Sequence, residues 1–154
     1  MNVIEITESH LLWLKVAEYA ESCSWDACKR MATHMKNSGF TDWERLFVAE
    51  ENGYFEGFCA LLKAQPFPGD EYRPLLKWLF VDEKYRGHRL SESLIDTAAD
   101  YAKSIGFDKL YLTTWHIDLY EKYGFVKLCD KEVREGYSEG IYEKCLTDEA
   151  RSEK

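Results

Sequence analysis

The first third of the chain carries three periodic runs of apolar residues. Residues 3–7 alternate apolar and polar side chains, which is the period of a strand. Ser9 is a candidate N-cap for a helix that breaks near residues 22–24. The apolar positions of this helix are Leu11, Leu12, Leu14, Val16, Ala17 and Ala20. A second helix, closed by Gly39 as its C-cap, is predicted from apolar spacings of three or four at Trp25, Cys28, Met31, Ala32 and Met35.

The middle of the chain predicts a hairpin and then an irregular stretch. Residues 45–50 and 54–64 are strand-like runs joined across Glu51, Asn52 and Gly53, which favours an antiparallel pair with a short Asn-Gly turn. Residues 65–74 contain all three prolines and are expected to be irregular. Because rigid scaffolds carry function on such loops, this stretch is either a loop on the substrate side or merely a crossover.

The second half of the chain predicts one parallel connection. Residues 75–81 form a near-continuous apolar strand interrupted by Lys77. The helix after it ends at Gly106 and places on one face Leu90, Leu94, Ala98, Ala102 and Ile105. Residues 109–114 form the next buried strand. A helix between these two strands predicts a right-handed βαβ unit in which the strands are parallel.

The last elements complete an α+β pattern. A short helix at residues 117–123 is stopped by Gly124, and strands at residues 125–133 and 141–146 flank the polar residues 135–140 as another hairpin. About seven strands in this order predict a mixed, mostly antiparallel sheet with helices on both faces and one parallel βαβ crossover. We expect a single domain at residues 1–146 and a charged, frayed tail at residues 147–154.

Composition narrows the classes of partner. The chain of 154 residues carries 20 Lys and Arg against 28 Asp and Glu, so its net charge is -8. This balance argues against nucleic acid or an anionic membrane held by a broad basic face, and an acidic surface favours cationic partners, including amines. The N-terminus lacks the features of a signal peptide, and no apolar run approaches the roughly 18 residues of a membrane-spanning helix. We therefore expect a cytoplasmic protein.

Cysteines and histidines give no sign of a metal or redox centre. The five cysteines are odd in number, form no C-x-x-C pair and are expected to be free thiols of a reducing compartment. The four histidines are scattered, and neither H-E-x-x-H nor a cysteine cluster occurs, so no metal is expected. No Walker motif or G-x-G-x-x-G motif supports a nucleotide site.

The stretch from residue 78 to residue 95 reads as a buried strand, a tight basic loop and the opening of an amphipathic helix. A strand that passes into a helix in this way leaves backbone N–H groups unpaired at a partly positive helix end, which suits phosphate. The six residues of the loop and the helix opening are Arg86, Gly87, His88, Arg89, Leu90 and Ser91.

Two motifs, together with the order of elements, resemble the GNAT superfamily of N-acetyltransferases. The loop follows the family pattern Q/R-x-x-G-x-G/A, with Arg89 in a glycine position and Ser91 in a glycine or alanine position. A Cβ at these positions is compatible with binding through backbone amides if the side chain turns away, and Arg89 could add a charge-assisted contact to phosphate. The second motif, Tyr-Glu-Lys-Tyr-Gly-Phe at residues 120–125, puts Tyr120 where the family places its general acid.

The resemblance implies that acetyl-CoA is the co-substrate and that an amine of a small molecule or peptide attacks its thioester directly. The pyrophosphate of acetyl-CoA is expected on the loop from Arg86 to Ser91. A backbone N–H near Leu79, Phe80 and Val81 would stabilise the tetrahedral oxyanion, and the same strand would pair with the pantetheine amides. Tyr120 would give a proton to the departing thiolate.

The base that deprotonates the amine is left open. Some relatives carry a glutamate at the start of the strand before the loop, where this chain has Leu75. His116 is the best-placed alternative because an unperturbed imidazole pKa of about 6.5 suits a base. Glu71 and Tyr72 on the irregular stretch are further candidates, and water could relay the proton.

Two other classes of function are compatible with the same residues. Leu75 and the altered loop also suit a non-catalytic acyl-CoA-binding or regulatory module, and a purely structural interaction domain would make the loop ordinary surface. A homodimer through the aromatic hairpin with Tyr137 and Tyr142 is a further expectation. Selectivity for the acceptor is expected in the first two helices and in residues 65–74.

Overall fold

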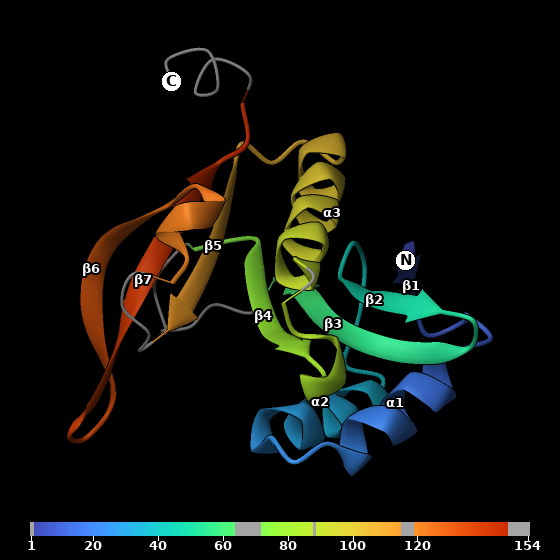
Figure 1. Ribbon diagram of the computed structural model, residues 1–154. Helices are drawn as coiled ribbons and strands as arrows, with labels where there is room; N and C mark the ends of the chain where they lie inside the picture. Colours follow the sequence, from blue (N-terminus) through green and yellow to red (C-terminus); the bar gives the residue numbers. More distant parts are fainter. Residues whose placement is uncertain (1, 64–71, 88, 115–118, 148–154) are drawn as a thin grey trace.

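The computed structural model describes residues 2–63, 72–87, 89–114 and 119–147. Seven strands form one sheet in the order β1-β2-β3-β4-β5-β7-β6, in which the β4–β5 pair is parallel and every other neighbouring pair is antiparallel. The predicted α+β fold with one parallel crossover is therefore confirmed (Figure 1). The strands are β1 (Asn2–Ile6), β2 (Arg45–Glu51), β3 (Tyr54–Leu62), β4 (Leu75–Val81), β5 (Lys109–Thr114), β6 (Phe125–Arg134) and β7 (Tyr137–Cys145).

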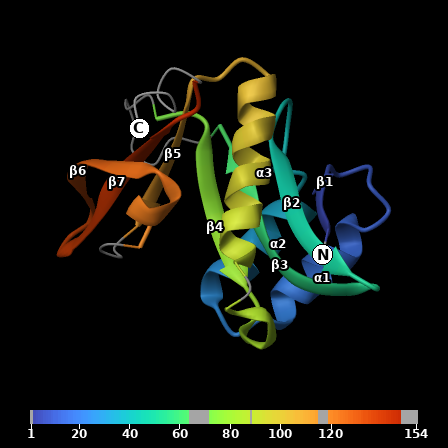
Figure 2. The ribbon, with the colours of Figure 1, turned by 45° about the horizontal axis from the view of Figure 1, so that its top comes forward.

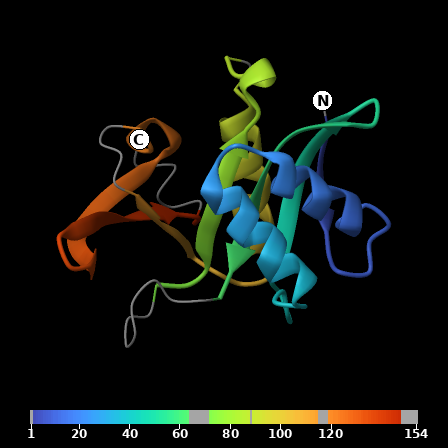
Figure 3. The ribbon, with the colours of Figure 1, turned by 90° about the horizontal axis from the view of Figure 1, so that it is seen from below.

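Helices cover both faces of the sheet, as predicted. The longer helices are α1 (Trp13–Ser22), α2 (Asp26–Lys36) and α3 (Leu90–Ser104), and two short 3-10 turns are η1 (Glu83–Tyr85) and η2 (Glu121–Tyr123). Figure 3 shows α1 and α2 on one face, and Figure 2 shows α3 lying over β2, β3 and β4 on the other. Each face has its own buried apolar cluster, and β4 contributes to both, because Trp78 and Phe80 pack toward one and Leu79 and Val81 toward the other.

The first helix begins later than predicted, at Trp13, so Ser9 as its N-cap is wrong. Residues 7–12 form turns in which the His10 ring nitrogen accepts a hydrogen bond of 3.0 Å from the Leu12 N–H. Leu11 and Leu14, which were predicted on the apolar face, are 94% and 67% exposed. The buried positions have the spacing of one helical face, which the extra leucines obscured; they are Trp13, Val16, Ala17 and Ala20.

The second helix ends in a left-handed residue one position before Gly39. Ser38 has φ of 54°, and the Gly39 N–H donates to the His34 carbonyl at 2.9 Å, which is the pattern of a Schellman end. Gly39 is required for a different reason, since an added Cβ would lie 2.4 Å from the His34 ring. The C-cap is Asn37, followed by the left-handed Ser38, so the predicted C-cap at Gly39 is wrong.

The turn of one hairpin lies where the sequence predicted it, and the turn of the other does not. Asn52 and Gly53 both have positive φ (53° and 85°), as a type I′ turn requires, and the predicted β2–β3 hairpin is confirmed. The β6–β7 turn is much shorter than the predicted residues 135–140, because β7 already begins at Tyr137 and Ser138 pairs with Glu132. Residues 137–140 belong to the strand, where Ser138 is exposed, Tyr137 and Glu139 are half-buried and Gly140 is buried.

The predicted helix at residues 117–123 is described from residue 119 onward. Within that part only the short turn η2 forms. Gly124 ends it with φ of 92°, as predicted.

The parallel pair β4–β5 is held at one end only. Its single registered pair is Leu75 with Tyr111, where the Tyr111 N–H also donates to the Pro74 carbonyl at 3.0 Å. Farther along β4, Trp78 has a left-handed φ of 57° and the register with β3 shifts between Phe58 and Ala60. Such a bulge bends a strand, and β4 diverges from β5 toward its carboxyl end (Figure 1).

In the part of the chain that the structure describes, no helix has the length and apolar character needed to cross a bilayer. All five cysteines are free, as predicted.

Substitution of Gly57 should destabilise the sheet beside the bulge. A Cβ on Gly57 would lie 2.5 Å from the Phe80 carbonyl oxygen and 3.2 Å from the Val81 Cα, so Gly57→Ala must push β3 and β4 apart. We expect a loss of about 1–3 kcal/mol in the free energy of unfolding, the usual cost of overpacking. Denaturant unfolding measures this loss, and a midpoint unchanged from the wild type would contradict the close approach of the two strands.

Candidate functional site

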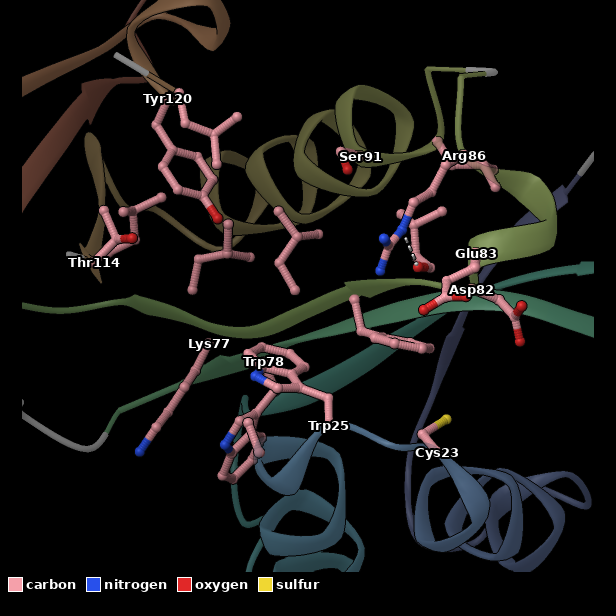
Figure 4. Close-up of a pocket in the computed structure, with 18 of the residues that line it drawn as sticks. Cys23, Trp25, Lys77, Trp78, Asp82, Glu83, Arg86, Ser91, Thr114 and Tyr120 are labelled. Carbon is pink, nitrogen blue, oxygen red and sulfur yellow. Dashed lines mark hydrogen bonds between the residues drawn. The ribbon is translucent and has the colours of Figure 1, made fainter. Parts of the chain in front are cut away.

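The divergence of β4 from β5 opens a cleft of about 1840 Å³. One wall is β4 itself, and the others come from the start of α3, the end of β5, the turn at η2 and the corner between α1 and α2. Figure 4 shows labelled side chains from each of these regions around the same space. Segments distant in the sequence therefore meet where the sheet is incomplete.

Asp82 anchors the loop between β4 and α3. Its backbone N–H donates to the Glu56 carbonyl at 2.9 Å, and its carboxylate accepts the Lys84 N–H at 3.2 Å, which caps η1. The other carboxylate oxygen accepts the hydroxyl of Tyr19 at 3.0 Å. This last bond joins α1 to the loop across 63 positions of sequence, so the helix pair on one face fixes the loop at the edge of the cleft.

The environment of Tyr19 favours the protonated phenol. Burial raises the pKa of Tyr19 strongly, and the hydrogen bond to the Asp82 carboxylate raises it further. The phenol must keep its proton to donate to a carboxylate, so the Tyr19–Asp82 bond holds throughout the neutral range.

The loop has the backbone of a glycine-rich turn although one glycine position holds arginine. Gly87 has φ of 90° and Arg89, the residue before α3, has a left-handed φ of 59°. No side chain of the described residues caps the N-terminus of α3, so its first N–H groups remain available. The Arg89 side chain is 86% exposed and reaches Glu92 at 3.8 Å.

Arg86 connects the loop back to the strand. Its Nε donates to the Val81 carbonyl at 3.2 Å, and Figure 4 shows the guanidinium extending from the loop into the cleft. The Ser91 side chain lies on the first turn of α3 at the same end. All the loop residues predicted to bind coenzyme A line the cleft except His88, which lies outside the described residues.

The strand residues predicted to bind coenzyme A also line the cleft. Leu79, Phe80 and Val81 are each partly exposed there. Because β4 has no registered pair with β5 beyond Leu75, its backbone at residues 79–81 has no β5 strand as a partner on that side. Backbone N–H and C=O groups left in this way must find other partners, and an extended ligand can supply them.

Tyr120 stands on the opposite wall from β4. Its ring packs edge-on against Phe125 at a centroid distance of 6.1 Å, and its carbonyl accepts the N–H groups of Tyr123 and Phe125 at 3.0 and 3.3 Å. Burial raises the pKa of Tyr120 to about 12, with smaller contributions from Tyr123 and Cys59. Figure 4 shows its hydroxyl pointing into the cleft, and that hydroxyl has no hydrogen-bond partner among the described residues.

The candidates for a general base are only partly described. His116 and Glu71 lie outside the described residues, so their roles stay predictions. Tyr72 packs its ring against Tyr111 at 5.4 Å and is not among the residues that line the cleft. Leu75 lines the cleft and is 3% exposed, so the strand start offers no carboxylate. In the described ranges no three His, Cys, Asp or Glu side chains gather as a metal site would require.

The sequence predicted a contribution of the first two helices to acceptor selectivity, but it did not identify the residues of one wall of the cleft. Trp25 and Arg30 of α2 and its preceding turn, Lys77 and Trp78 of β4, and Glu139 of β7 all line it. The lone charge of Lys77 in an otherwise apolar strand was the one local signal for this wall. The other contributions depend on tertiary contacts between elements.

Removal of the Tyr19 hydroxyl should make the free energy of unfolding depend less on pH in the alkaline range. Tyr19→Phe loses the bond to Asp82, and we expect about 1–2 kcal/mol less stability at pH 7. The pKa of Tyr19 is higher in the folded protein than its value of about 10 in the unfolded chain. The stability that the protonated phenol contributes is therefore full below about pH 10 and is lost as the pH rises above it. The difference in the free energy of unfolding between wild type and variant should narrow there. Urea unfolding between about pH 7 and 11 tests this.

Tyr54→Phe is the control for this measurement. The Tyr54 side chain is 70% exposed, so its loss of a hydroxyl should leave stability unchanged. A difference between Tyr19→Phe and wild type that does not depend on pH would contradict the assignment.

Comparison with known proteins places the chain in a family. The family model described as "Acetyltransferase (GNAT) family" matches residues 10–125, while no curated protein matches. Among solved structures, an aminoglycoside 6'-acetyltransferase type Ii is 15% identical with a TM-score of 0.74, covering 96% of this chain and 98% of that one. An aminoglycoside 6'-N-acetyltransferase complexed with coenzyme A is 14% identical with a TM-score of 0.73 over 96% and 98%. A spermidine N-acetyltransferase from Vibrio cholerae is 15% identical with a TM-score of 0.67 over 100% of both chains. These structures share the fold, and the family model identifies the chain as a member of the GNAT family of acetyltransferases.

Proposed function

We propose that this protein transfers the acetyl group of acetyl-CoA to a primary amine of a small molecule or peptide, with Tyr120 as the general acid. The observation that carries the proposal is the cleft where β4 leaves β5, with an unpaired strand edge on one side and the Tyr120 hydroxyl on the other. Membership in an acetyltransferase family supports the same reaction class.

Acetyl-CoA would bind along the loop and the strand. The backbone amides around Gly87 and the first turn of α3 would hold its pyrophosphate, helped by the charges of Arg86 and Arg89. The pantetheine arm would then lie beside residues 79–81 and pair with the strand as an added strand does. The thioester would in that case lie near the point of divergence, within the space that Tyr120 faces.

The reaction needs one nucleophilic attack and one proton transfer to the leaving group. The neutral amine nitrogen attacks the thioester carbon, and a backbone N–H of β4 stabilises the oxyanion that forms. Collapse of the intermediate breaks the C–S bond. The attacking nitrogen releases its extra proton to solvent, the thiolate takes the phenol proton of Tyr120, and solvent returns a proton to the phenolate. Because the pKa of Tyr120 is about 12, the phenol is protonated at neutral pH and ready to donate.

The acceptor amine must lose its proton before attack. We keep His116 as the candidate base, with water relay as the alternative, since Leu75 removes the carboxylate that some relatives use. We also propose that the activity belongs to one domain at residues 1–146, followed by the charged tail at residues 147–154. A cytoplasmic location and a homodimer stay predictions.

A non-catalytic acyl-CoA-binding or regulatory module is the second candidate. The buried Leu75 at the strand start favours it, because a module without turnover has no need of a base. Binding of acetyl-CoA without thiol release on any amine would establish the module and exclude the transferase.

Removal of the Tyr120 hydroxyl should slow turnover without weakening acetyl-CoA binding. For Tyr120→Phe we expect kcat to fall about 100-fold, the lower range for loss of a general acid, with an unchanged Kd for acetyl-CoA. Thiol release and calorimetry measure the two quantities. Tyr123→Phe, close by in η2, is the matched control and should keep full activity. A Tyr120→Phe variant as active as the wild type would remove the general-acid role.

Two glycines offer a test of the loop that separates binding from stability. Gly87 and Gly106 flank α3 and have φ of 90° and 103°, and a Cβ added at either would meet open space. Alanine at either position should cost about 1–2 kcal/mol of stability, because both positions are left-handed. Only Gly87→Ala should also weaken acetyl-CoA binding, by about 10-fold, since it alone borders the proposed phosphate site. Equal affinities of the two variants by calorimetry would count against that site.

A further inference from the structure

Among the described residues, the charges that line the cleft are mostly positive, whereas the protein as a whole is negative. Six Lys or Arg side chains line it among the described residues, against three Asp or Glu, although the whole chain has a net charge of -8. Arg30 and Lys77 are two of the six, and the proposed cofactor site does not account for them. The other four lie in the connection between β4 and α3, beside the proposed phosphate site, and in η2; they are Lys84, Arg86, Arg89 and Lys122.

Lys77 lies at the end of the cleft away from the loop, and Arg30 lines the cleft from α2. Lys77 is near the start of β4, whereas the carbonyl that binds Arg86 belongs to Val81 at its end. At the rise of roughly 3.3 Å per strand residue, about 13 Å separate the two ends. Figure 4 likewise shows Lys77 and Arg86 on different sides of the cleft.

Arg30 and Lys77 are exposed residues that both line this cleft. Within the described ranges, neither has a carboxylate oxygen inside 4.0 Å. Loss of solvation lowers the pKa of Lys77, the Arg30 charge lowers it further, and Glu139 opposes both effects. One Glu139 oxygen already accepts the Tyr137 hydroxyl at 3.1 Å. Two cations in one cleft, without a carboxylate in ion-pair contact among the described residues, leave positive charge that an anionic ligand group would stabilise.

Two tryptophans make the adjoining surface apolar. Trp25 is 45% exposed and stacks on Phe80 at a centroid distance of 6.2 Å with 19° between the rings. The Trp78 ring centroid lies 5.0 Å from the Lys77 ammonium, which holds that charge beside the aromatic surface. An indole exposed at a cleft is unfavourable in water and a good contact for an apolar ligand group.

We propose that the acceptor amine carries both a carboxylate and an apolar or aromatic group, as an apolar amino acid does. This inference rests on the proposed transferase function and names the substrate class for the same cleft. The carboxylate lies between Arg30 and Lys77, the apolar group lies against Trp25 and Trp78, and the amine points toward the thioester. Polycationic amines are disfavoured, because Arg30 and Lys77 repel them where they would have to enter.

The first test compares amines that differ only in this charge. Acetyl transfer from acetyl-CoA is measured for phenylalanine, for phenylalaninamide, which has a neutral amide in place of the carboxylate, and for spermidine. We expect kcat/KM to be at least about 10-fold higher for phenylalanine than for its amide, as one charge-assisted contact implies, and lowest for spermidine. Equal values for the first two amines, or a preference for spermidine, would overturn the inference and leave the transferase function in place.

The second test assigns the preference to the two cations. Arg30→Gln and Lys77→Gln should each reduce the preference for phenylalanine over its amide about 10-fold, with little change for the amide itself. Lys29→Gln is the matched control, since Lys29 neighbours Arg30 on α2 but does not line the cleft. Thermal unfolding checks that each variant is folded. A preference that both substitutions leave intact would overturn the assignment.

Binding separates this inference from the function on which it rests. If no amine is acetylated, calorimetry of phenylalanine and its amide on the protein loaded with coenzyme A still reports the subsite. Tighter binding of phenylalanine, lost in Lys77→Gln, supports the carboxylate site while the failed turnover excludes the transferase. Equal binding of the two amines excludes the carboxylate site.

Discussion

The structure depends on an interrupted pairing between two parallel strands. One registered pair, Leu75 with Tyr111, ties β4 to β5, and beyond it the bulge at Trp78 turns β4 away. An interior strand that loses its neighbour leaves polar backbone groups facing a gap, which is costly unless solvent or a ligand satisfies them. The gap between β4 and β5 is kept open by the antiparallel strands on each side, by the two apolar clusters and by α3. The cleft is thus a local loss of strand pairing within a sheet that is otherwise well paired.

Local chemistry in the sequence was enough to predict most of the elements and the end of the cleft near the loop. The Asn-Gly turn, the glycine after α3 and the two motifs at residues 86–91 and 120–125 each depend on neighbours in the chain. The start of α1 was mispredicted because exposed leucines at positions 11 and 14 resembled a buried face. The start of β7 was mispredicted because its first residues, from Tyr137 to Gly140, have the polar and glycine-containing composition of a turn.

The remainder of the site depends on tertiary contact. The bond between Tyr19 and Asp82 joins residues 63 positions apart, and no periodicity in either segment indicates it. The left-handed Trp78 in the middle of an apolar strand has no local signal either, since bulky residues seldom adopt that conformation. Arg30 on α2 and Glu139 on β7 line the same cleft as Lys77, and their charges act on its ammonium, although the three residues lie far apart in the sequence.

The left-handed Arg89 has a consequence for how such loops are recognised. Its φ of 59° reproduces the conformation that glycine adopts most easily, while its side chain points outward and is 86% exposed. A ligand held by backbone amides responds to torsion angles and is largely indifferent to which side chains those positions carry. A search that demands glycine at each motif position would therefore pass over proteins whose backbone meets the geometric requirement by other means. For loops of this kind, dihedral angles are a better signature than residue identity.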